Sequence, residues 1–352
     1  MQMEAAHIVV AGAGGNTGSH LLAHIARIPR VAGLTLVDPD TYEPANLAVQ
    51  NIDAADLGQP KVVAQAARLG RIRPDLAIAP IQARVEDVPR GLLRCDLFVS
   101  CLDSRAARQH LSEIAWHLGT PLIDCGVLGG QNLARMTTWT PAPGSPCIEC
   151  AWGPEDYALL GQEYLCGGER ATAFPTGASS DLGALAASLV ALELARFLCH
   201  ETLPLAREVI FDAEHRVIQT TQERCNRECR FDHAVWRIDS WLAPPSITTL
   251  AQALRELGTL RIEGHRFISE LVCPGCGRHE NLGLRLNRPL ARCAACNRRM
   301  ASAGFGARDF LDSALAAPFL DLNADLTLDQ IGIHAGDMVS CGDGHRQIVE
   351  AA

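Results

Sequence analysis

The chain has 352 residues, 48% of them hydrophobic, which is enough for one large domain with an appendage or for two domains. No apolar run reaches the length of about 18 residues that a membrane span needs, and the first residues lack the features of a signal peptide. We therefore expect a cytoplasmic protein with no membrane partner. The formal net charge of −9 argues against broad binding to nucleic acid.

The first third of the chain alternates short apolar strands with amphipathic helices. We expect strands at residues 7–11, 33–37, 76–80, 95–101 and 121–126, and helices at 15–28, 59–69 and 105–118. This alternation predicts an α/β fold with a doubly wound, mostly parallel sheet, because parallel strands need helical crossovers.

The pattern changes beyond residue 126. We expect a strand at 133–139, a long irregular stretch at 141–176, a buried helix at 181–198 and a β-hairpin at 207–221. The Ala-Pro-Pro sequence within residues 236–248 is typical of a linker. These features predict a first domain at 1–235, a linker at 236–248 and a small C-terminal domain at 249–352.

A glycine-rich loop at residues 11–18 follows the first predicted strand and opens the first helix. Glycines let the backbone approach a phosphate, and a helix N-terminus offers free N–H groups. Asp38, at the end of the second strand, is placed to accept hydrogen bonds from ribose hydroxyls. By itself the loop favours NAD or FAD as much as ATP. Its nucleotide-binding candidates are Gly12, Gly14, Gly15 and Asn16.

Four further motifs follow the loop in a fixed order. Asp38-x-Asp40 ends the second strand, and an Asn-Leu-x-x-Gln motif begins at Asn46. A Gly-x-x-Lys motif then ends at Lys61, and Asp103 follows the strand at 95–101. This ordered set resembles the ubiquitin-activating family, including its bacterial ThiF and MoeB branch, over roughly residues 7 to 230.

The resemblance implies an enzyme that uses ATP to adenylate the C-terminal carboxylate of a ubiquitin-like or sulfur-carrier β-grasp protein. Asp38 would bind the ribose, with Asp40 beside it in the nucleotide site, and Asn46 would contact the phosphates. Lys61, the only lysine among 31 Lys and Arg residues, would neutralise phosphate charge during the attack. Asp103 would hold Mg²⁺, which bridges phosphate oxygens.

One position departs from the family pattern. The family often has arginine where this chain has Val49. Either another arginine (Arg71, Arg73 or Arg84) takes its place, or the catalytic power is reduced. A non-catalytic scaffold with a degenerate site is therefore an alternative interpretation. An NAD-dependent oxidoreductase is another, although it does not explain the Lys61 and Asp103 motifs.

Eight of the 14 cysteines fall in four close pairs, the spacing with which a chain presents two thiolates to one tetrahedral ion. The first two pairs match the structural zinc clamp of many family members, with His233 as an alternative ligand. The last two pairs form a zinc-ribbon pattern, which we interpret as a protein-docking module because it lacks aromatic residues to stack bases. Two structural Zn²⁺ sites are thus predicted. The pairs are Cys147/Cys150, Cys225/Cys229, Cys273/Cys276 and Cys293/Cys296.

Cys166 lies between the first cysteine pair and the buried helix, flanked by glycines and close in sequence to Arg170. Family members that pass the adenylate on to a thioester keep their nucleophile in a comparable crossover loop, so the resemblance makes Cys166 a candidate nucleophile. An ordinary loop cysteine is the alternative. The resemblance also implies a homodimer and, if a thioester forms, a conjugating enzyme as acceptor.

Overall fold

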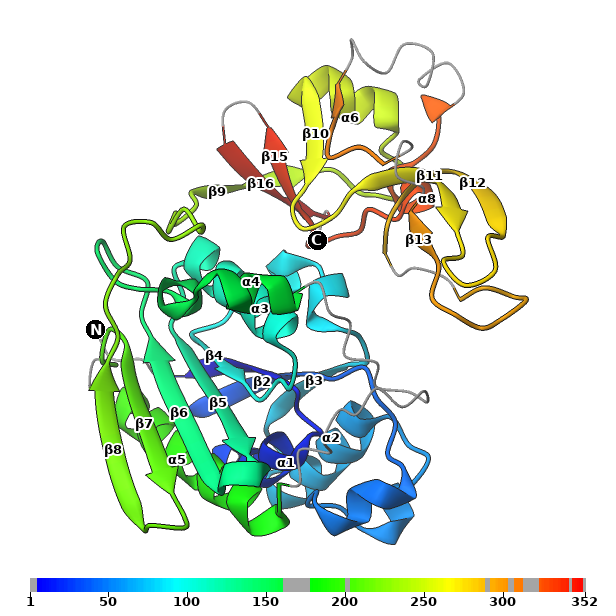
Figure 1. Ribbon diagram of the computed structural model, residues 1–352. Helices are drawn as coiled ribbons and strands as arrows, with labels where there is room; N and C mark the ends of the chain where they lie inside the picture. Colours follow the sequence, from blue (N-terminus) through cyan, green and yellow to red (C-terminus); the bar gives the residue numbers. More distant parts are fainter. Residues whose placement is uncertain are drawn as a thin grey trace. The chain divides into compact units, whose positions relative to one another are not determined.

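The computed structural model describes residues 5–160, 178–199, 203–288, 292–302, 307–312, 323–341 and 344–350. The chain divides into two compact units (Figure 1). Unit 1 comprises Met1–Glu86 and Arg94–Val235, and unit 2 comprises Asp87–Leu93 and Trp236–Ala352. None of the helices in the described ranges combines the length and apolar composition that a membrane span requires.

Unit 1 is built on an eight-stranded sheet in the order β3-β2-β1-β4-β5-β6-β7-β8. The first five strands in this order are parallel and the last three are antiparallel additions at one edge. This topology confirms the predicted doubly wound, mostly parallel sheet. The strands are β1 (Ala6–Ala11), β2 (Val31–Val37), β3 (Ala77–Ile81), β4 (Leu97–Ser100), β5 (Leu122–Leu128), β6 (Leu133–Trp139), β7 (Arg207–Asp212) and β8 (Val217–Gln222).

Helices cover both faces of this sheet, with α1, α2 and α5 on one side and α3 and α4 on the other (Figure 1). Inward-facing residues of the parallel strands, such as Ile8, Leu36 and Val99, form one core with the apolar faces of α1 and α5. The helices are α1 (Asn16–Ile25), α2 (Lys61–Ile72), α3 (Arg105–Leu118), α4 (Pro154–Leu160) and α5 (Ser180–Leu198). Short 3₁₀ turns are η1 (Pro44–Ala48), η2 (Ala54–Asp56), η3 (Val85–Asp87), η4 (Arg90–Leu93), η5 (Gly129–Gln131) and η6 (Ile148–Ala151).

Unit 2 has its own core and two sheets, in the orders β14-β10-β15-β16-β9 and β12-β11-β13. The helix α6 (Leu250–Leu257) buries its leucines in this core, and its first turn is capped by Thr249. The other elements are β9 (Ile238–Leu242), β10 (Thr259–Ile262), β11 (Phe267–Val272), β12 (His279–Leu286), β13 (Ala301–Ser302), β14 (Leu311–Asp312), α8 (Leu328–Ile331), β15 (Met338–Cys341) and β16 (Gly344–Val349).

The predicted linker at 236–248 is corrected by the structure. Its residues Ile238–Leu242 form β9, which pairs in parallel with β16, and Trp241 is buried in the core of unit 2. The two prolines that suggested a linker, Pro244 and Pro245, lie just beyond this strand. The segment Asp87–Leu93, which the sequence places in the first domain, groups with unit 2.

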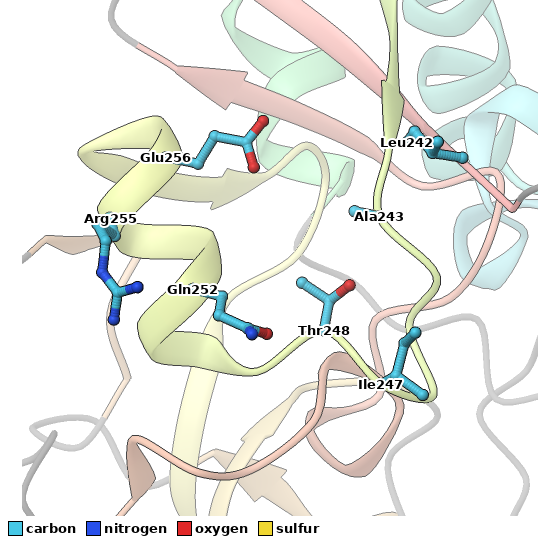
Figure 2. A pocket seen from close by; sticks show the side chains of 7 residues that line it. All are labelled: Leu242, Ala243, Ile247, Thr248, Gln252, Arg255 and Glu256. Atoms are coloured by element: carbon cyan, nitrogen blue, oxygen red, sulfur yellow. The ribbon is translucent and has the colours of Figure 1, made fainter.

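A hollow of about 450 Å³ lies beside β9 and α6 in unit 2 (Figure 2). Leu242, Ala243 and Ile247 give it apolar lining, and Arg255 and Glu256 of α6 lie at its polar side. Glu256 accepts a hydrogen bond from the indole nitrogen of Trp241 at 2.7 Å. This carboxylate therefore satisfies the buried indole of the unit 2 core. None of the predicted nucleotide or metal residues lines the hollow.

Candidate functional site

The glycine-rich loop connects β1 to α1 and lies against the end of β4. Gly12 has a left-handed backbone (φ +76°), and a Cβ there would lie 2.5 Å from the carbonyl oxygen of Cys101. Only glycine fits this position. The N-cap of α1 is Gly15, which makes no side-chain cap, so the first N–H groups of α1 remain available to an anion.

The sequence predicts that Asn16 binds the nucleotide, but its side chain makes hydrogen bonds elsewhere in the protein. Its amide nitrogen donates to the carbonyl oxygens of Ala178 and Ser179 at 3.2 and 3.1 Å, just ahead of α5. A Cβ on Gly183 of α5 would overlap this side chain, so α1 and α5 approach closely here. Asn16 can therefore offer a nucleotide its backbone N–H, while its side-chain amide joins the two helices.

Asp38 is buried, with 4% of its surface exposed, and ties the loop to the end of β2. Its carboxylate accepts hydrogen bonds from the backbone N–H of Gly14 at 2.9 Å and of Asp40 at 3.1 Å. Burial raises the pKa of Asp38, and the positive charge of Lys61 opposes that shift. The carboxylate keeps further lone pairs with which it could accept from ribose.

Lys61 begins α2 and lies directly over the loop. Its side chain is 8% exposed, and its ammonium group lies 3.2 Å from a carboxylate oxygen of Asp40. A Cβ on Gly14 would come within 2.3 Å of the Lys61 Cβ, so the lysine stem covers this glycine. Four predicted residues thus meet at one place: Gly14, Asp38, Asp40 and Lys61.

Asp103 follows β4 and precedes α3, and its side chain is exposed. The N-cap of α3 is the neighbouring Ser104, whose hydroxyl accepts from the N–H of Ala107 at 3.1 Å. Helix capping by Asp103 therefore does not explain why an aspartate stands at this position. The preceding residues Cys101 and Leu102 lie under Gly12, which puts Asp103 at the same edge of the sheet as the loop.

The segment after Asp40 is shaped by its own polar side chains. Asn46 accepts the backbone N–H of Glu43 at 2.8 Å, which leaves its amide group for a phosphate. Val49 provides no cation. Of the proposed replacements, Arg73 bonds Asp75 and Arg84 bonds Glu86, both near the surface. Arg71 lies in the last turn of α2, at the opposite end from Lys61.

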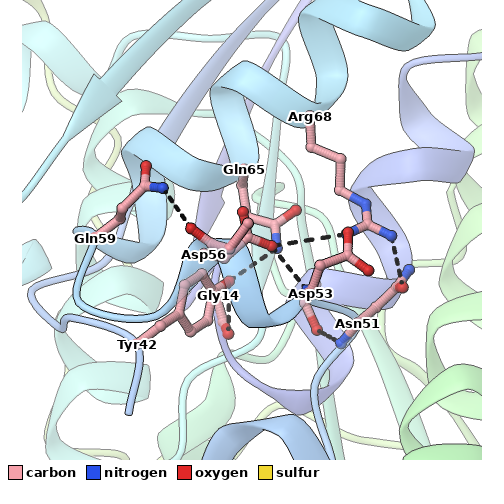
Figure 3. A network of polar contacts seen from close by, with 10 residues as sticks. Gly14, Tyr42, Asn51, Asp53, Asp56, Gln59, Gln65 and Arg68 are labelled. Atoms are coloured by element: carbon pink, nitrogen blue, oxygen red, sulfur yellow. Dashed lines mark hydrogen bonds and ion pairs between the residues drawn. The ribbon is translucent and has the colours of Figure 1, made fainter. Parts of the chain in front are cut away.

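An arginine missed by the sequence reasoning holds this segment to α2 (Figure 3). Arg68 donates to Asn51 at 3.1 Å and to Asp53 at 3.2 Å, and the backbone N–H of Asn51 donates to Ser19 of α1 at 3.0 Å. Arg68 lies on the third turn of the predicted helix, but nothing in the sequence pairs it with Asn51. Its partners give it a structural role in fixing the chain that follows Val49.

In the first cysteine set, the structure gathers three of the four predicted cysteines with the alternative ligand His233. Donor atoms of Cys147, Cys150, Cys229 and His233 lie within 4.8 Å of one another. Cys225 is exposed and lies outside this group, although its thiol contacts that of Cys150. The Nε2 atom of His233 lies 3.2 Å from the Cys150 sulfur. The His233 ring is held edge-on by Trp116, with centroids 4.9 Å apart, which explains why it points inward. Three thiols and an imidazole fit a closed tetrahedral zinc site.

The second set gathers all four predicted cysteines of unit 2. Cys273 lies 3.4 Å from Cys296 and Cys276 lies 3.5 Å from Cys293, measured between sulfur atoms. Each pair sits on the same type of turn, closed by a left-handed residue, Gly277 in one and Asn297 in the other. Such paired turns aim four thiols at one point, as a structural zinc site requires. Cys166 and Arg170 lie outside the described residues.

Known proteins are similar to this chain mainly over the residues of unit 1. The model of the ThiF family matches residues 1–231. The molybdopterin-synthase adenylyltransferase of Escherichia coli is 29% identical over 187 residues, 52% of this chain and 70% of that protein. The SAMP-activating enzyme E1 of Haloferax volcanii is 27% identical over 228 residues, 63% of this chain and 78% of that protein.

Solved structures agree on the fold. A crystal structure of E. coli MccB with ATP has 19% sequence identity and a TM-score of 0.52, and the match covers 65% of this chain and 67% of MccB.

Proposed function

The chain belongs to the ThiF family, and from this premise we propose that it uses ATP to adenylate the C-terminal carboxylate of a ubiquitin-like or sulfur-carrier protein. Relatives named as adenylyltransferases, and one named as an activating enzyme, support this assignment. The observation that carries it is the position of Lys61, buried over Gly14 beside Asp38 and Asp40.

In this reaction a carboxylate oxygen attacks the α-phosphorus, the bond to the bridging oxygen breaks, and pyrophosphate leaves. The products are an acyl-adenylate and pyrophosphate. The free N–H groups of α1 would bind phosphate oxygens, and Lys61 would neutralise the charge that grows during the attack. Asp103, exposed at the same edge, would hold Mg²⁺, which supplies further charge neutralisation.

The first test is pyrophosphate exchange, measured with ATP, Mg²⁺ and candidate β-grasp proteins that end in Gly-Gly. We expect at least one candidate to promote exchange, and Asp103→Ala to lower the rate by on the order of 100-fold because the metal loses its protein ligand. Asp75→Ala, which removes an exposed carboxylate paired with Arg73, is the control and should retain the rate.

The two alternatives give different outcomes. ATP binding without exchange for any candidate would favour the non-catalytic scaffold, for which Val49 is the motive. Binding of NAD in place of ATP would refute adenylation and favour the oxidoreductase.

We further propose that Cys166 receives the acyl group. Its thiolate would attack the acyl carbonyl, forming a thioester and releasing AMP. Cys166→Ala should then spare pyrophosphate exchange and remove any adduct that reducing agents cleave, as seen by gel electrophoresis with and without a thiol. If the adduct persists in this variant, another cysteine is the nucleophile.

The remaining assignments complete the same proposal. The two cysteine-rich sets hold structural Zn²⁺ and take no part in the chemistry. The protein works in the cytoplasm as a homodimer, and a conjugating enzyme accepts the thioester. The zinc-binding turns of unit 2 favour conjugation over simple sulfur transfer, because activation alone needs no such docking module.

A further inference from the structure

Gly14 is the fixed point of the phosphate loop. Its N–H donates to Asp38 at 2.9 Å. Its carbonyl oxygen accepts the hydroxyl of Tyr42 at 3.3 Å (Figure 3). With both groups of one residue engaged, the direction in which the chain enters α1 is set. Since the free N–H groups of α1 are the anion-binding element, this direction decides where they point.

Tyr42 is itself held from α2. The residue is 2% exposed, and its hydroxyl oxygen accepts a hydrogen bond from the amide nitrogen of Gln65 at 2.8 Å. Burial raises the pKa of Tyr42, so the hydroxyl stays protonated and can donate to Gly14 at neutral pH.

The hydrogen bond to Tyr42 is the polar contact that accounts for Gln65. It is 1% exposed, and its carbonyl oxygen is buried without a hydrogen-bond partner in the part of the chain that the structure describes. An apolar side chain would avoid the cost of that unpaired acceptor. The useful group of Gln65 is therefore the amide nitrogen that it gives to Tyr42.

Lys61 and Gln65 are four residues apart on α2, so they lie on one face of the helix, one turn apart. Both reach the loop at Gly14: the lysine stem by direct contact, the glutamine through Tyr42. The helix that carries the phosphate-neutralising cation is thereby locked to the loop that supplies the N–H groups.

We propose that Tyr42 and Gln65 form a brace that positions the phosphate loop against Lys61, and so sets the affinity for the triphosphate of the nucleotide. This inference rests on the proposed function. Both residues act through the loop and Lys61, so they are positioning residues.

The test compares the dissociation constants of ATP and of adenosine. Tyr42→Phe removes only the hydroxyl, and we expect the dissociation constant of Mg·ATP to rise by on the order of 10-fold, measured by titration calorimetry. Adenosine, which has no phosphates, should bind the variant as it binds the natural protein, measured by ligand-observed NMR. Tyr157→Phe, which removes a hydroxyl from α4, is the control and should leave both values unchanged.

A double-mutant cycle then tests the brace. Gln65→Met should also weaken ATP binding, but in the Tyr42→Phe background it should have no further effect, because its partner is already absent. Effects that simply multiply would refute the brace.

Other outcomes are equally decisive. Equal loss of ATP and adenosine affinity, or a lower melting temperature with unchanged ATP affinity, would make these residues merely structural. Failure of the natural protein to bind ATP would refute the proposed function itself, which separates the two claims.

Discussion

At the scale of single residues, the first metal site has four clustered donors and a nearby fifth candidate, Cys225, for an ion that takes four ligands. Cys147, Cys150 and Cys229 belong both to the four cysteines predicted from the sequence and to the cluster in the structure, so the two sets differ only in Cys225 or His233. His233 adopts a left-handed backbone (φ +54°), uncommon for a residue other than glycine, and its ring packs against Trp116 and Phe231. A costly conformation that turns a ring toward three thiols favours the imidazole as ligand.

We therefore expect Cys225→Ser to keep both zinc ions per chain. His233→Ala should weaken the binding of one of them by more than the roughly 10- to 100-fold that the loss of an outer-shell partner costs, because it removes a ligand. Zinc content after dialysis against a chelator, measured by mass spectrometry, checks this. In the cobalt-substituted protein, the thiolate charge-transfer absorption should be unchanged by Cys225→Ser. If instead that variant loses the zinc and His233→Ala retains it, the four-cysteine clamp predicted from the sequence is right.

At the scale of elements, a buried ion pair joins the two sheets of unit 2. Arg288, just after β12, donates to both carboxylate oxygens of Asp337, just before β15, at 2.8 and 3.2 Å. The side chains are 4% and 1% exposed, and the N–H of His334 donates to the same carboxylate at 2.7 Å. Because the ion pair is bidentate and buried, removal of either side chain should strongly lower the free energy of unfolding.

Arg288→Met leaves a buried carboxylate without its partner, so we expect the free energy of unfolding of unit 2 to fall by about 3–5 kcal/mol. Urea denaturation followed by tryptophan fluorescence should show it. Arg237→Met, in an exposed pair with Asp239, is the matched control and should change stability by less than about 1 kcal/mol. A loss no larger than the control's would show that water reaches the Arg288 site.

Elements with strong local signals were predictable. The helix at 105–118 begins after the capping residue Ser104 and ends at Gly119, which has the left-handed backbone typical of a helix end. The strand β9 was missed because its five residues precede two prolines, and its hydrogen-bonding partner lies about a hundred residues away in β16. Pairing over such a distance leaves no local trace.

At the scale of the whole molecule, the residues of the candidate site also divide into those with a local sequence signal and those placed by contacts with distant parts of the chain. The sequence named Gly14, Asp38, Asp40 and Lys61 as candidates through the ordered motifs. They meet because the parallel strands β1 and β2 end at one edge of the sheet and α2 begins there with Lys61. The side-chain direction of Asn16 was not predictable, since α5 fixes it from over 160 residues away. Tyr42 and Gln65 form no motif, and only their contact reveals them.

The chain passes between the two units at three places, after Glu86, after Leu93 and after Val235. Within unit 2, the backbone N–H of Gly91 donates to the carbonyl of Gly336 at 2.8 Å, and the Arg90 guanidinium lies over the Trp236 ring. Residues 87–93, which connect β3 to β4 in the sequence, are therefore part of unit 2, so this unit is formed by two separate segments of the chain. Transfer of residues 236–352 alone to another adenylating domain would therefore lose the Gly91–Gly336 hydrogen bond and the contact between Arg90 and Trp236, so an engineered fusion of unit 2 has to include residues 87–93.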